Sequence, residues 1–214
     1  MKNSSIVLAL VAAAIISGCA TVDTQQIARS MYNVRETGVS EFDGTKYVRM
    51  KNIACSGDQV IRLDLYQDSR LARANQAILK VKVTGVHSIG GGKSLHFNID
   101  GEFMDLETAD QTTDMEEVFA AQYAPGYVGG GTYVAPAYSP AMRASTKRYP
   151  ISEKIIEKIG KAKRVVVRVD LSGSYVEGLC SPRESGWTKE NEWVRELTGT
   201  EGFRGFSEMT RTLD

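Results

Sequence analysis

The stretch RVVVRVDLSGSYVEGLC, Arg164 to Cys180, decides the fold class. Apolar side chains recur at every second position of its first half, at Val165, Val167, Val169 and Leu171. A period of two residues is typical of a strand with one buried face, and the Ser172-Gly173 pair that follows is a turn signal. The stretch therefore predicts an antiparallel β-hairpin.

Pairing the two strands about this turn gives a specific register. It sets Val169 opposite Val176 on one face and Arg168 opposite Glu177 on the other, so apolar meets apolar and opposite charges meet. Cys180 then lies on the same inward face as Val165.

The residues on either side of this hairpin predict helices. Over 152–160, Ser152 is a typical N-cap, and Gly160 is a typical stop. Three isoleucines between them share one helical face, at Ile155, Ile156 and Ile159. The tail over 188–213 has the pattern of one or two short helices, and a further short helix is expected within residues 23–34.

A second hairpin is predicted over residues 47–67, where two alternating runs flank a Ser-Gly-Asp turn. Its register sets Met50 opposite Leu65 and Ala54 opposite Ile61. This register places Cys55 on the polar face.

The stretch HSIGGGKSLHF, His87 to Phe97, ends in a Gly-Lys-Ser that is similar to the end of a phosphate-binding loop. Such a loop needs a glycine at the position of His87 and a helix after the lysine. The alternation after Lys93 predicts a strand instead, so we expect no nucleotide. The stretch predicts a third hairpin that turns at Gly91-Gly92 and sets His87 opposite His96 and, through a bulge at Gly85, Val83 opposite Ile99.

His87 and His96 are the two histidines of the chain and the weak candidates for a metal site. Two imidazoles are too few ligands for a tight site, so no metal or other cofactor is expected, and a polar pair at the end of the hairpin is the alternative. No G-x-S-x-G elbow occurs, and no catalytic residue is predicted.

Residues from about 120 to 145 predict a flexible loop rich in Gly, Tyr and Pro. Its tyrosines are the candidate partner-binding residues, since Tyr supplies contact area at a low cost in entropy: Tyr123, Tyr127, Tyr133 and Tyr138. The alternative is an insertion that contacts no partner.

The amino terminus has the pattern of an export signal. Residues 1–18 contain one cation, Lys2, and an apolar run of eleven residues from Ile6 to Ile16, whereas a membrane-spanning helix needs about 20. The sequence Ile-Ser-Gly-Cys that ends at Cys19 resembles the lipobox of bacterial lipoproteins. This resemblance implies cleavage before Cys19 and a diacylglycerol on its sulfur. Because Ala20 rather than Asp follows, it also implies the outer membrane.

The resemblance to lipoproteins also predicts how the rest of the chain is divided. Residues 19–44 are expected to form a lipidated tether, and residues 45–214 a single periplasmic domain. Cys55 and Cys180 would then be exported to an oxidising compartment, which favours a disulfide between them. Two separate buried thiols are the alternative.

The predicted fold is α+β, an antiparallel sheet or sandwich of about six strands in hairpins with helices on one side. The chain has 26 basic and 26 acidic residues, so its formal charges balance, and these residues are scattered along the sequence. This charge distribution does not favour nucleic acid as a partner. The segments FNIDGEF and YPIS…RVVVRVDLSGSYVEG resemble uncharacterised bacterial lipoproteins, and this likeness carries no activity with it.

We expect an outer-membrane-anchored lipoprotein that faces the periplasm, with exposure on the cell surface as an alternative. It would act as a binding or structural accessory to an envelope protein partner. An envelope hydrolase and a surface adhesin-like module are the alternative functions.

Overall fold

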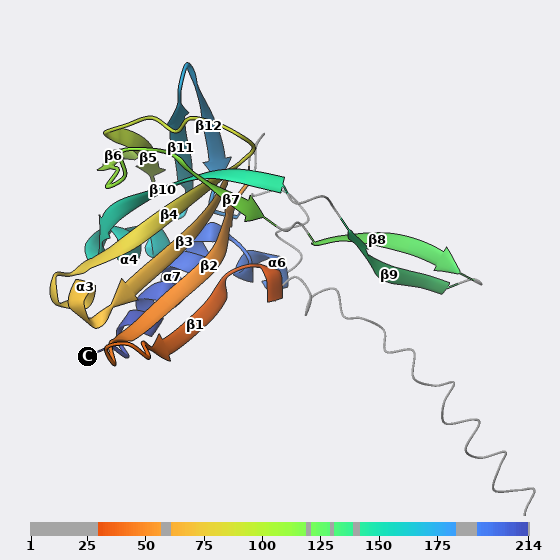
Figure 1. Ribbon diagram of the computed structural model, residues 1–214, viewed down its shortest axis with the longest axis horizontal. Coiled ribbons are helices and arrows are strands. Elements are labelled where there is room, and N and C mark those ends of the chain that lie inside the picture. Colours follow the sequence, from red (N-terminus) through yellow and green to blue (C-terminus); the bar gives the residue numbers. More distant parts are fainter. Residues whose placement is uncertain are drawn as a thin grey trace, which may run out of the picture.

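The fold is built from two antiparallel sheets (Figure 1). The computed structural model describes residues 30–56, 61–118, 121–128, 131–138, 142–182 and 192–213. A six-stranded sheet has the order β1 (Val34–Val39), β2 (Lys46–Cys55), β3 (Ile61–Asp68), β4 (Gln76–Thr84), β10 (Met142–Ser152) and β7 (Asp114–Val118). A four-stranded sheet has the order β12 (Ser174–Leu179), β11 (Val165–Leu171), β5 (Lys93–Ile99) and β6 (Glu102–Glu107).

The remaining elements are four described helices and one two-stranded sheet. The helices are α3 (Ser69–Arg73), α4 (Glu153–Lys161), α6 (Glu192–Glu196) and α7 (Gly199–Thr210). The separate sheet consists of β8 (Ala121–Val128) and β9 (Gly131–Tyr138). The predicted α+β class with antiparallel sheets and C-terminal helices is confirmed, with more strands than the six expected. None of the described helices is long and apolar enough to cross a membrane.

The buried side chains of both sheets and of α4 and α7 form one core. Alternate residues of β2, β3, β4, β5 and β11 are buried, as the period of two requires. Phe97 of β5 meets Phe203 of α7 edge to face, with ring centroids 6.3 Å apart. The helix α7 thus connects the two sheets through the core.

The hairpin predicted over Arg164 to Cys180 is confirmed. β11 and β12 pair with Arg168 opposite Glu177 and Val169 opposite Val176. Cys180 is buried with Val165, whose carbonyl accepts a hydrogen bond from the Cys180 N–H.

The hairpin of β2 and β3 differs from its predicted register beyond Met50. Met50 lies opposite Leu65 as expected, but the register then shifts, and Cys55 rather than Ala54 lies opposite Ile61. The cause is a bulge at Asn52, which has a φ of 57° and donates its N–H to Asp64 Oδ1 at 2.9 Å. One extra residue reverses the parity of everything after it. Cys55 is therefore buried rather than on the polar face.

The predicted hairpin at Gly91-Gly92 was wrong. β4 pairs with β3 and β10, whereas β5 pairs with β6 and β11, so Val83 does not pair with Ile99. Asp100 and Gly101, with φ of 52° and 94°, instead form the turn between β5 and β6. Asp-Gly with positive φ at both positions is the strongest two-residue hairpin signal. The segment 85–92 crosses from one sheet to the other.

The predicted helix over 152–160 is confirmed as α4, with two corrections. Ser152 occupies the N-cap position, but its side chain makes no capping hydrogen bond. Gly160 lies inside the helix rather than at its end. A Cβ there would lie 3.0 Å from the backbone nitrogen of Arg204 in α7, so a side chain at this position would push α4 and α7 apart.

The amino-terminal boundary of the domain also needs correction. β1 lies within residues 19–44, which we predicted to be a tether, and pairs along its whole length with β2. The fold therefore includes residues before 45. Residues 1–29, with the predicted signal and Cys19, lie outside the described part of the chain, as does most of the helix predicted over 23–34.

The bulge at Asn52 can be tested by substitution. We predict that Asn52→Gly changes the free energy of unfolding by less than about 1 kcal/mol, because glycine adopts positive φ freely. Asn52→Val should lower it by roughly 1–2 kcal/mol, since a β-branched residue is strained in that region. Urea unfolding of the oxidised protein measures both. Equal stability of the two variants would contradict the positive φ at this position.

Candidate functional site

The disulfide predicted from the two remaining cysteines joins the two sheets. The sulfurs of Cys55 and Cys180 are 2.06 Å apart, and the Cα atoms are 4.1 Å apart. Cys55 ends β2 in one sheet, and Cys180 follows β12 in the other. Both cysteines are buried, so the disulfide lies in the core and leaves no exposed thiol that could react.

Two glycines let the backbone close around this bond. A Cβ on Gly178 would lie 3.1 Å from both Cβ and O of Cys55, and one on Gly199 would lie 2.8 Å from Cys180 Cβ. A side chain does not fit at Gly199, and at Gly178 it would force the atoms of Cys55 to move, so both positions favour glycine. We call these four residues the disulfide seam: Cys55, Gly178, Cys180 and Gly199.

The two histidines predicted to be neighbours lie on different elements. His87 is in the crossing segment, where its Nε2 lies 3.0 Å from the carbonyl oxygen of Thr84. His96 is on β5, opposite Asp105 of β6 and Arg168 of β11. Their expected pairing was wrong because β4 and β5 belong to different sheets. Among the described residues, no group of three or more His, Cys, Asp or Glu side chains is arranged to hold a metal ion.

His96 is held between two carboxylates on the solvent side of the four-stranded sheet. Its Nδ1 lies 2.7 Å from Asp105 Oδ1, and its Nε2 lies 2.9 Å from Asp170 Oδ2, both within hydrogen-bond distance. Burial alone would lower the pKa of His96, but these hydrogen bonds outweigh it and raise the pKa above its ordinary value. When the ring is protonated, both nitrogens donate to these carboxylates and no lone pair remains for a metal or a substrate.

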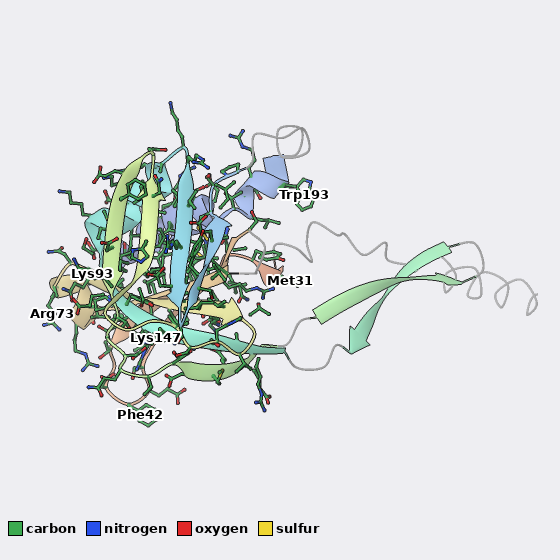
Figure 2. The ribbon with its side chains drawn as sticks, turned by 90° about the horizontal axis from the view of Figure 1, so that it is seen from above. Met31, Phe42, Arg73, Lys93, Lys147 and Trp193 are labelled. Carbon is green, nitrogen blue, oxygen red and sulfur yellow. A yellow bond between two sulfur atoms is a disulfide. The ribbon has the colours of Figure 1, made fainter. Side chains whose placement is uncertain are left out.

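The crossing segment covers a buried lysine. Lys147 of β10, labelled in Figure 2, is 2% exposed and donates to the carbonyl of Gly90 at 2.8 Å. Beside Gly90, the hydroxyls of Ser94 and Tyr149 are hydrogen-bonded at 2.9 Å, and burial raises the pKa of Tyr149. The hydrogen bond from Lys147 holds the glycine-rich stretch in place, and Lys93 itself lies at the exposed start of β5.

The four candidate tyrosines lie on β8 and β9 rather than in an irregular loop. Figure 1 and Figure 2 show from two directions that these strands extend away from the body of the domain. We call β8 and β9 the arm. The β7–β10 ladder ends at Val118 opposite Met142, and the arm begins at Ala121 opposite Tyr138. The two ladders therefore differ in register by one residue.

The register of the arm sorts the tyrosines onto two faces. Tyr123 lies opposite Pro136, Tyr127 opposite Thr132, and Tyr138 opposite Ala121, whereas Tyr133 lies opposite Gly126. Because opposite and alternate residues share a face, Tyr123, Tyr127 and Tyr138 belong to one face and Tyr133 to the other.

The two prolines of the arm affect its edges. Pro125 and Pro136 occupy positions of the same parity, one on each strand. Proline has no N–H, so it fits a strand where the N–H would point away from the neighbouring strand. Each outer edge of the arm would therefore lack one donor, which disfavours the addition of a further strand.

Helices α3, α4 and α7 line a cleft of about 170 Å³ that was not predicted from the sequence. It lies between the end of α3, the first turns of α4 and the last turns of α7. Glu153, Glu157 and Arg211 supply its charged groups, and Ile156 and Phe206 its apolar lining. The four-residue spacing of Glu153 and Glu157 on a predicted helix was a usable signal, but the position of Arg211 depends on the packing of α7 against α4.

No family model matches this chain, and no curated protein matches it.

Proposed function

We propose that this protein is a lipoprotein of the outer membrane that acts in the periplasm as a binding or structural accessory to an envelope protein. The observation that carries the proposal is the buried Cys55–Cys180 disulfide. Such bonds persist in exported proteins and are rare in the reducing cytosol. The disulfide supports export, and the lipobox-like sequence that ends at Cys19 supports a lipid anchor.

The arm is the proposed contact with the partner. Its two strands contain no charged residue, and the register gives one face three tyrosines together with Pro125, Val134 and Pro136. A face of this composition suits an uncharged protein surface, since aromatic rings contribute large contact areas with few rotatable bonds. Because the prolines disfavour strand addition, the contact would be made through this face rather than through an edge.

Neither the hydrolase nor the adhesin-like module has a specific observation in its favour, so the proposal is limited to the accessory role. The proposed lipid anchor and the proposed contact of the arm are tested by separate experiments.

The anchor is tested by Cys19→Ala. We predict that this variant incorporates no labelled fatty acid and keeps its signal segment, because the thiol that would carry the lipid is absent. One acyl chain binds a membrane only marginally, whereas two or more anchor stably, so the wild type should fractionate with membranes. Equal labelling of variant and wild type would refute the anchor.

The arm is tested by replacing tyrosines on one face at a time. We predict that a variant with Ser at Tyr123, Tyr127 and Tyr138 loses the proteins that cross-link to the wild type in native membranes, whereas Tyr133→Ser retains them. Deletion of Pro125–Pro136 should also abolish cross-linking while changing the free energy of unfolding by no more than about 0.5 kcal/mol, as for a surface change.

Two results would contradict the proposed contact. Unfolding of the domain on deletion would mean that the arm belongs to the core. An unchanged set of cross-linked proteins in the three-tyrosine variant would mean that this face contacts no partner.

A further inference from the structure

Helix α3 and the carboxyl end of α7, which line the cleft together with α4, lie on the side of the domain away from the arm (Figure 1). Figure 2 agrees, since Arg73 of α3 is labelled on the opposite side of the body from β8 and β9. The volume of the cleft, about 170 Å³, is several times the roughly 30 Å³ that one water molecule occupies in the liquid. A second cavity of about 120 Å³ between α4 and α7 shares Glu157, Ser207 and Arg211 with the lining of the first.

Two opposite charges in this cleft have no ionic partner within the described ranges of the chain. Glu153 is the first residue of α4 and forms no ion pair, and Arg211 is the C-cap of α7 and forms none either. Neighbouring charged residues do form ion pairs: Glu157 pairs with Lys161 at 3.1 Å, and Arg204 pairs with Glu201 at 2.8 Å. Each unpaired charge lies at the helix end whose dipole favours it.

Gln67 supplies a second, independent observation at Glu153. This glutamine is fully buried, and its Nε2 donates to the Gln76 carbonyl at 2.9 Å and to Glu153 Oε1 at 2.5 Å. Its Oε1 is buried and has no hydrogen-bond partner in the described structure. A buried acceptor without a donor is costly. The hydrogen bond from Gln67 orients the Glu153 carboxylate, which lines the cleft and can still accept hydrogen bonds from a ligand that brings N–H donors.

We propose that this cleft binds a small zwitterion, a free amino acid or dipeptide with an apolar side chain. Its ammonium group would bind Glu153 and its carboxylate would bind Arg211, which offers paired N–H donors to a carboxylate. Ile156 and Phe206 form the buried floor of the cleft, and the partly exposed Ala72 and Thr210 would contact the apolar side chain. This site is independent of the proposed docking role of the arm.

The test uses the full chain purified in detergent and titrated with L-leucine and with L-leucyl-L-leucine, followed by backbone NMR shifts and calorimetry. We expect saturable binding of at least one probe with a Kd of order 1 mM, as suits so small a ligand. N-acetyl-leucine amide, which lacks both charges, should not bind. Binding by leucine alone would assign the first cavity, and tighter binding by the dipeptide would assign both cavities.

Matched variants separate charge recognition from nonspecific binding. Glu153→Gln and Arg211→Gln should each weaken binding at least tenfold, whereas Lys154→Gln, on an exposed residue of the same helix that does not line the cleft, should not. Unfolding curves check that the variants remain folded. No saturable binding of either probe up to about 10 mM, ten times the Kd expected for a ligand of this size, or unchanged binding by both charge variants, would overturn the proposal.

Discussion

The Cys55–Cys180 disulfide is the constraint on which the arrangement of the two sheets depends. It joins residues 125 positions apart in the sequence, and closing a loop of this size contributes about 4–5 kcal/mol on the chain-entropy model. That is a large fraction of the roughly 5–15 kcal/mol by which domains are stable. The bond forms because the bulge at Asn52 turns Cys55 inward, and because Gly178 and Gly199 let the backbones approach.

Sequence patterns predicted the parts of the fold that are local. The β11–β12 register was correct because its turn and its cross-strand pairs lie within seventeen residues, 164–180. The predicted β4–β5 hairpin was wrong because the Asp100-Gly101 turn competes for the same strand and was overlooked. The insertion of β10 between β4 and β7 joins segments far apart in the chain. Periodicity alone carries no information on such pairing.

The candidate sites were predictable to different degrees. The tyrosines of the arm were found by composition, but their division between two faces required the register. The histidine pair was wrong for the same reason as the hairpin, and the hydrogen bonds of His96 to Asp105 and Asp170 depend on three neighbouring strands. The cleft combines residues from three helices. Contacts of this kind arise from tertiary packing and have no motif in the sequence.

The account as a whole requires that the chain is exported and that its two sheets are locked together by one disulfide. The most direct measurement is mass-spectrometric peptide mapping of the protein isolated from cell envelopes, alkylated and digested without reduction. The account predicts that the peptides containing Cys55 and Cys180 are recovered as one linked species. Recovery of both cysteines as alkylated free thiols from natively folded protein would contradict it.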